Sequence, residues 1–164
     1  MRSMDPMTLA DAAAAPFRFT AALLFDADIH AVSEELRDPS QWFPLMRRSV
    51  WHTGATSGVG AERIVEITGF GRFHERMLVW EQDSRVAFTM IGTTSPLAAR
   101  MLEDYRLTRV DGKTRLDWVF AAYPTALGRV LTPLTRATLR TMAAGIQRNL
   151  GRRAASYPRG KQAV

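Results

Sequence analysis

The chain has 164 residues, of which 46% are hydrophobic and 23% charged, a composition typical of a single folded domain. It has no cysteine, which excludes disulfides and thiolate sites, and no apolar run approaches the roughly 18 residues of a membrane-spanning helix. The net charge of +6 is unevenly spread, because residues 1–117 hold 14 basic and 16 acidic side chains whereas residues 118–164 hold eight basic and no acidic ones. The basic excess therefore belongs to the C-terminal segment.

The N-terminal third of the chain predicts a leader, a strand and a short helix. Residues 1–16 carry acids and lack the long apolar core of a signal peptide, so we expect a disordered leader. Residues 17–25 alternate between apolar and other side chains and predict a strand. Asp26 and Asp28 can cap a helix over roughly 29–37. An irregular link with two prolines follows, and it carries Trp42 and Phe43.

The middle of the chain is a series of short runs separated by turn signals. Short strands joined by short turns predict an antiparallel meander. The runs are 49–55, 59–69, 70–82, 84–92, 100–110 and 113–124.

Residues 126–153 change to a helical period, which predicts a long C-terminal helix. Pro133 lies inside the pattern, and Thr132 as cap with Pro133 in the first helical position predicts a break there. Residues 154–164 are predicted to be a flexible basic tail. The apolar arc of the helix is formed by Leu127, Val130, Leu131, Leu134, Leu139, Met142, Ile146 and Leu150.

The stretch FHERMLVW, residues 73–80, places a carboxylate on an apolar strand face. Read with period two, Phe73, Glu75, Met77 and Val79 share one face, and His74, Arg76, Leu78 and Trp80 share the other. Glu75 is an edge residue that reaches water, half of a buried ion pair, or a reactive group in a pocket. An unpaired carboxylate there would be costly.

Arg63 is the expected partner, because it is the one charged residue on the apolar face of the preceding run. Glu103 and Tyr105 add polar groups on another apolar face. Together with Arg63 and Glu75 they form a candidate cluster that either orients a ligand carbonyl or hydroxyl, or supplies acid–base chemistry. The alternative is a structural ion pair, and one β-bulge would turn Glu75 outward.

Three phrases of the sequence resemble the START-like (SRPBCC) superfamily, and within it the polyketide cyclase/dehydrase and lipid-transport branch. They are FDAD…LRDPSQWFPLM, VGAERIVEITGFGRFHERMLVWEQDSRVAFTM and VDGKTRLDWVFAAYP. The resemblance covers roughly 17–153. It implies an α+β helix-grip fold, in which a strongly bent antiparallel sheet of about seven strands wraps around the C-terminal helix. It also implies a deep, mostly apolar cavity between sheet and helix, but no catalytic residue that can be carried over.

The resemblance and the strand faces together predict which side chains line that cavity. Trp118 is expected on its apolar wall, and Trp42 and Phe43 could shape its entrance. The predicted ligand-binding residues are Arg63, Phe73, Glu75, Met77, Phe88, Met90, Glu103, Tyr105, Leu116, Trp118, Phe120, Leu134 and Met142.

Several kinds of site are excluded by their spacing. His74-Glu75 resembles the start of a zinc-protease motif, but Leu78 stands where the second histidine would be needed, so we expect no metal site. The segment GVGAER (58–63) lacks the third glycine of a dinucleotide-binding loop and runs into a strand, so no cofactor is expected.

The sequence favours a cytoplasmic protein that binds a small lipid- or polyketide-like molecule in an internal cavity. The first alternative is an enzyme, a lyase of the polyketide cyclase/dehydrase type, with Glu75, Arg63, Tyr105 and Glu103 as candidate catalytic residues. The second is a protein that docks on a partner or an anionic membrane through the basic final helix, which carries Arg129, Arg136 and Arg140.

Two further inferences concern partners and origin. Nucleic-acid binding is not expected, since Tyr157 alone supplies an aromatic ring among the C-terminal charges. The ratio of 20 arginines to two lysines fits a GC-rich bacterial genome. The oligomeric state is left open.

Overall fold

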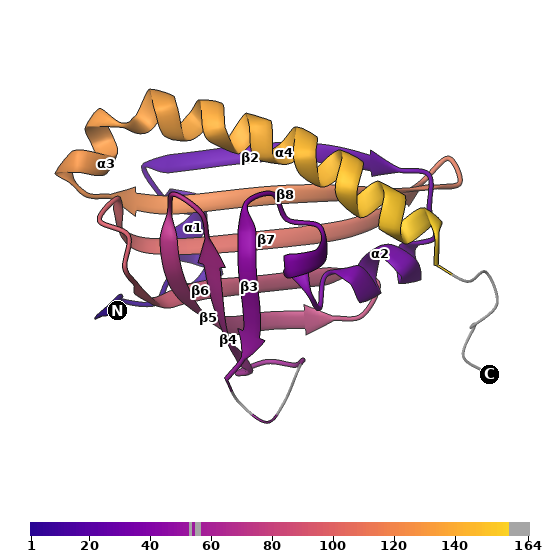
Figure 1. Cartoon of the computed structure of the whole chain (residues 1–164), viewed down its shortest axis with the longest axis horizontal. Coiled ribbons are helices and arrows are strands. Elements are labelled where there is room, and N and C mark those ends of the chain that lie inside the picture. Colours follow the sequence, from indigo (N-terminus) through magenta and orange to yellow (C-terminus); the bar gives the residue numbers. More distant parts are fainter. Residues whose placement is uncertain (53, 55–56, 158–164) are drawn as a thin grey trace.

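The computed structural model describes residues 1–52, 54 and 57–157 (Figure 1). The strands are β1 (Arg2–Ser3), β2 (Phe17–Phe25), β3 (Met46–Trp51), β4 (Glu62–Ile67), β5 (Gly71–Glu81), β6 (Arg85–Thr93), β7 (Ala98–Val110) and β8 (Lys113–Pro124). The helices are α1 (Leu9–Ala14), α2 (Ile29–Glu35), the short 3-10 helix η1 (Pro39–Gln41), α3 (Ala126–Val130) and α4 (Thr132–Ala155).

All strands join one antiparallel sheet in the order β2-β8-β7-β6-β5-β4-β3, with β1 paired to the end of β6. Figure 1 shows α4 extending along the sheet beside β2 and β8, with α3 at one end and α2 near the other. The predicted helix-grip fold is confirmed, with seven strands in the main path and an eighth, β1, added to it.

The strand β2 shows why the sheet has one apolar face. Phe17, Phe19, Leu23 and Phe25 are buried, and the residues between them are exposed or partly exposed, as the alternation predicted. This face packs under α4, whose Leu139, Met142, Ile146 and Leu150 are also buried. The α2 helix is capped by Asp28, whose side chain accepts a hydrogen bond from the backbone N–H of His30.

The first turns of the C-terminal helical segment differ from the predicted pattern. The break near Pro133 is confirmed, but the cap is Leu131, and the Thr132 hydroxyl instead donates to the carbonyl of Gly128 at 3.1 Å. Gly128 lies directly against the backbone of Leu97, since a Cβ atom at this position would be 1.9 Å from the Leu97 carbonyl oxygen. The apolar side chains of these turns therefore face outward, and the predicted arc is wrong at Leu127, Val130 and Leu134.

Residues 1–16 are not a disordered leader. The α1 helix begins with a capping box in which Thr8 and Asp11 each accept a hydrogen bond from the other's backbone N–H. Met7 is 1% exposed and packs, with Ala12, against the face of the sheet that points away from α4. Residues 1–16 thus supply apolar side chains that cover an outer patch of the sheet.

Two register shifts between β5 and β6 bear on which face of the sheet the side chains of β5 occupy. Between His74 and Glu75 the extra residue is Ile91, on β6, so the alternation of β5 is unbroken and Glu75 stays inward. Between Met77 and Val79 the extra residue lies on β5 itself. Leu78 accordingly packs with the outer cluster and Trp80 with the inner core, so the prediction that they share a face is wrong.

The α4 helix continues to Ala155, slightly past the expected domain end at 153. The rest of the predicted tail, 158–164, lies outside the described residues. Within the described part of the chain, no helix is both long and apolar enough to cross a membrane.

Candidate functional site

Arg63 and Glu75 form a buried ion pair at the centre of the site. They are direct register partners on β4 and β5. Arg63 Nε and Nη2 both contact Oε2 of Glu75, at 2.8 and 2.7 Å. Trp51 and Phe88 cover the guanidinium, with ring centroids 5.2 and 5.4 Å from its central carbon. Burial raises the pKa of Glu75, and the positive charge of Arg63 counters that rise.

A second buried carboxylate lies beside this pair. Oε2 of Glu103, on β7, accepts hydrogen bonds from the Tyr105 hydroxyl at 2.6 Å and from Trp118 Nε1 at 2.9 Å. Burial is the main cause that raises the pKa of Glu103 to about 7, and the charge of Glu75 raises it further, against the two hydrogen bonds. Burial also raises the pKa of Tyr105 well above its usual value. Glu103 is therefore poised to hold or release a proton near neutral pH.

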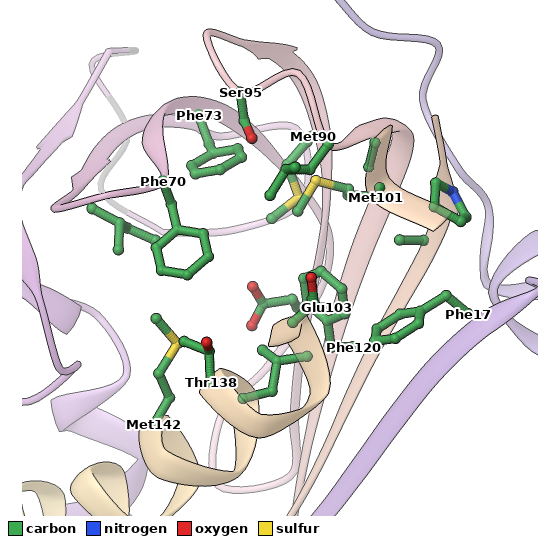
Figure 2. A pocket seen from close by; sticks show the side chains of 18 of the residues that line it. Phe17, Phe70, Phe73, Met90, Ser95, Met101, Glu103, Phe120, Thr138 and Met142 are labelled. Atoms are coloured by element: carbon green, nitrogen blue, oxygen red, sulfur yellow. The ribbon is translucent and has the colours of Figure 1, made fainter. Parts of the chain in front are cut away.

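A cavity of about 80 Å³ lies between the sheet and the first half of α4. Figure 2 shows phenylalanine and methionine side chains around this space, with Thr138 and Met142 reaching it from α4 and Glu103 among the apolar groups. A smaller cavity of about 20 Å³ lies beside Arg63 and Tyr105. Glu75 and Glu103 line both cavities, so the carboxylates stand where the two adjoin.

Ten of the thirteen residues predicted to bind a ligand line one of these cavities. Their role in binding stays a prediction. The larger is lined by Phe73, Glu75, Met90, Glu103, Trp118, Phe120 and Met142, and the smaller adds Arg63, Phe88 and Tyr105.

The other three predicted residues lie elsewhere. Met77 and Leu116 are fully buried in the packed core, because strand phase gives the face of a sheet but not the point along it where the cavity opens. Leu134 is 62% exposed, because the side of α4 that lines the larger cavity carries Thr135 and Thr138 instead. Trp42 and Phe43, expected near an entrance, line the smaller cavity, and Phe43 also lines the larger one.

Several lining residues were missed by sequence reasoning. Phe70, Ser95 and Leu97 come from connections between strands, where periodicity carries no signal. Thr132, Thr135 and Thr138 also line the larger cavity, and their spacing of three is a signal that places them on one side of the helix. In the residues that the structure describes, no three histidine, aspartate or glutamate side chains gather as metal ligands would.

The bent sheet, the long helix and the cavity between them define a START-like helix-grip protein. The model of the polyketide cyclase/dehydrase and lipid transport family matches residues 16–156, and the chain belongs to this family. An uncharacterized protein of Mycobacterium tuberculosis is 27% identical over 141 residues, which cover 82% of this chain and 84% of that protein.

Solved structures support the same fold. A START superfamily protein from Mycobacterium smegmatis superposes with a TM-score of 0.66 at 12% identity, covering 83% of this chain and 96% of the other. A hypothetical protein from Helicobacter pylori gives 0.72 at 14% identity, over 94% and 99% of the two chains. Ara h 8.0201 gives 0.63 at 9% identity, over 82% and 97%.

Proposed function

We propose that this is a cytoplasmic protein that binds a small hydrophobic molecule, lipid- or polyketide-like, in the cavity between the sheet and α4. The observation that supports the proposal is the cavity itself, whose walls are mostly apolar residues, with phenylalanine and methionine prominent among them. A few polar groups, Glu75 and Glu103 above all, reach it from one side. Membership of a family described by polyketide chemistry and lipid transport supports the same class of ligand.

Binding of the neutral fluorescent probe N-phenylnaphthylamine tests this proposal. We expect saturable binding that unlabelled hydrophobic molecules displace. Ala122 lines the cavity, so Ala122→Phe should block it, whereas the same substitution at the exposed Ala22 should leave binding unchanged. Equal binding by both variants, or no saturable binding by the wild-type protein, would overturn the carrier function.

Catalysis on the bound molecule is a second candidate, favoured by the state of Glu103. A carboxyl group with a pKa of about 7 can donate a proton to a carbonyl or take one from a neighbouring carbon. Its hydrogen-bond partner Tyr105 would orient it. Incubation with a poly-β-keto thioester tests the idea: Glu103→Gln should abolish cyclised product while probe binding persists. Equal product formation by the variant would eliminate Glu103 as the acid.

Docking on an anionic membrane is a third candidate, favoured by the exposed apolar turns of α3 and α4. Leu127, Val130 and Leu134 are 48, 76 and 62% exposed, and Arg129 lies exposed among them. Arg140 is also exposed, while Arg136 packs over the ring of Phe17.

Co-sedimentation with phosphatidylserine vesicles tests the docking candidate. Serine at the three exposed apolar positions should release the protein from the vesicles, and so should moderate salt if the arginines contribute. Wild-type protein that stays in the supernatant at low salt would remove this candidate.

A further inference from the structure

One polar atom beside the smaller cavity has no partner in the described part of the chain. Arg63 is 3% exposed, and its Nη1 atom is buried without a hydrogen bond to any described residue. The other two nitrogens of the guanidinium contact Glu75. A buried N–H group without an acceptor is unfavourable, so such an atom in a native site calls for an acceptor from outside the protein.

The smaller cavity offers the space for that acceptor. Glu75 occupies one edge of the guanidinium, and the rings of Trp51 and Phe88 lie against it. Arg63 lines the cavity of about 20 Å³, which has room for roughly one water-sized group. This cavity adjoins the larger one at Glu75 and Glu103. A group that reaches Arg63 can therefore belong to a molecule whose body lies in the larger cavity.

We propose that Arg63 Nη1 donates a hydrogen bond to a neutral oxygen acceptor, a ketone or ester carbonyl, at one end of the hydrophobic ligand. The apolar remainder of the ligand occupies the larger cavity. This inference rests on the proposed carrier function and names its ligand class: a neutral carbonyl compound and not a free fatty acid.

The charges around the site select against a carboxylate. The groups that face the smaller cavity are Arg63 on β4, Glu75 on β5, and Glu103 and Tyr105 on β7. The positive charge of Arg63 is already balanced by Glu75 at 2.7 Å. An anionic ligand would add an uncompensated negative charge in a buried, weakly polar space. The raised pKa of Glu103 is in line with this, since the site already disfavours a second carboxylate charge.

Three eight-carbon probes separate the possibilities: methyl hexyl ketone, octane and octanoate. Each is titrated against bound N-phenylnaphthylamine at neutral pH. In Arg63→Met/Glu75→Met the donor disappears together with its counter-charge, so no buried charge is left unpaired. The matched control is Arg85→Met/Asp104→Met, which removes an ion pair with two 2.9 Å contacts that lines neither cavity.

We expect the ratio of ketone affinity to octane affinity to fall about tenfold in Arg63→Met/Glu75→Met, because one hydrogen bond from a charged donor is lost. In the control variant the ratio should stay within about twofold of the wild-type value. Wild-type protein should bind octanoate more weakly than the ketone, a comparison that needs no variant. An unchanged ratio would mean that Arg63 Nη1 bonds only water, and tighter binding of octanoate would reverse the ligand class. Saturable probe binding in either case would leave the carrier function standing.

Discussion

Arg63 and Glu75 face each other across β4 and β5 and form a 2.7 Å ion pair in the protein interior, beside a second buried carboxylate, Glu103. Their side chains are only 3 and 5% exposed. Such a pair contributes little net stability compared with two apolar residues, but each partner makes the other tolerable. The pair therefore places a guanidinium with one unbonded donor atom next to a cavity. The free-energy cost of burying the two charges stays low only while both partners are present.

Glu75→Gln should destabilise the protein strongly, because it leaves the buried Arg63 charge without a counter-charge. We expect a loss of about 3 kcal/mol or more in the free energy of unfolding, measured by urea denaturation. Arg63→Met/Glu75→Met should recover most of that loss. The exposed pair of Arg115 and Asp117 serves as the control, since Asp117→Asn should change stability by less than about 1 kcal/mol. A silent Glu75→Gln would show that Arg63 finds compensation elsewhere.

This pair was predictable because the signal was local. One charge on each of two apolar strand faces, in adjacent runs of a meander, predicts a cross-strand pair, and the structure confirms it. The same alternation failed at Trp80, because a bulge on β5 adds a residue that no sequence pattern marks. The cavity between sheet and helix was expected, but its extent along the strands was beyond prediction, because strand phase gives a face and not a position along it, as Met77 and Leu116 show.

The N-terminal residues show the opposite error, in which a weak local signal hid an ordered segment. Most of the apolar residues of the segment are alanines, which give a weak hydrophobic signal, and its helix has only six residues, too short to be stable alone. Its order comes from tertiary contacts with the outer face of the sheet, to which Leu102 and Ala121 contribute. Only the Thr8–Asp11 capping box could have indicated it.

Met7→Ala tests whether that segment is part of the fold. Met7 is 1% exposed, and its backbone N–H donates to Thr89 Oγ1 at 2.7 Å. Removing its side chain should leave a cavity and lower the free energy of unfolding by about 2–4 kcal/mol. Met1, which is 56% exposed, offers the comparison, because Met1→Leu should have no effect on thermal melting. Equal melting temperatures for the two variants would mean that the Met7 side chain contributes nothing to stability.

Gly145 lets α4 approach the loop that follows η1. A Cβ atom at this position would lie 2.4 Å from Cγ of Pro44, whereas at Gly151 it would lie 3.3 Å from the ring of Phe25. Gly145→Ala should therefore cost about 1–3 kcal/mol through overpacking, despite the better helix propensity of alanine. Gly151→Ala, in the same helix, should be neutral or slightly stabilising. Urea unfolding of both variants measures the difference, and equal stability would show that Pro44 moves aside freely.

The titration of Glu103 predicts how stability depends on pH. Its pKa is about 7 in the folded protein and 4.5 as an ordinary glutamate, so between these values the folded state binds a proton that the unfolded chain has released. Stability must then fall as the pH rises from about 4.5 to 7, and it must level off above that range. The full effect is on the order of 3 kcal/mol. The pKa of Glu75 is also raised, so its contribution has the same sign.

Glu103→Gln isolates the part that belongs to this residue. The amide oxygen can still accept from Tyr105 and Trp118, and the amide has no proton to lose, so the variant should show a flatter profile between about pH 5 and 8. At the alkaline end it should be more stable than the wild-type protein, because no carboxylate has to be buried. Glu81→Gln, at an exposed position, should follow the wild-type curve. Urea unfolding across this pH range checks all three proteins. If Glu103→Gln also followed the wild-type curve, Glu103 would ionise in the folded protein as it does in water, and the acid–base role would lose its physical basis.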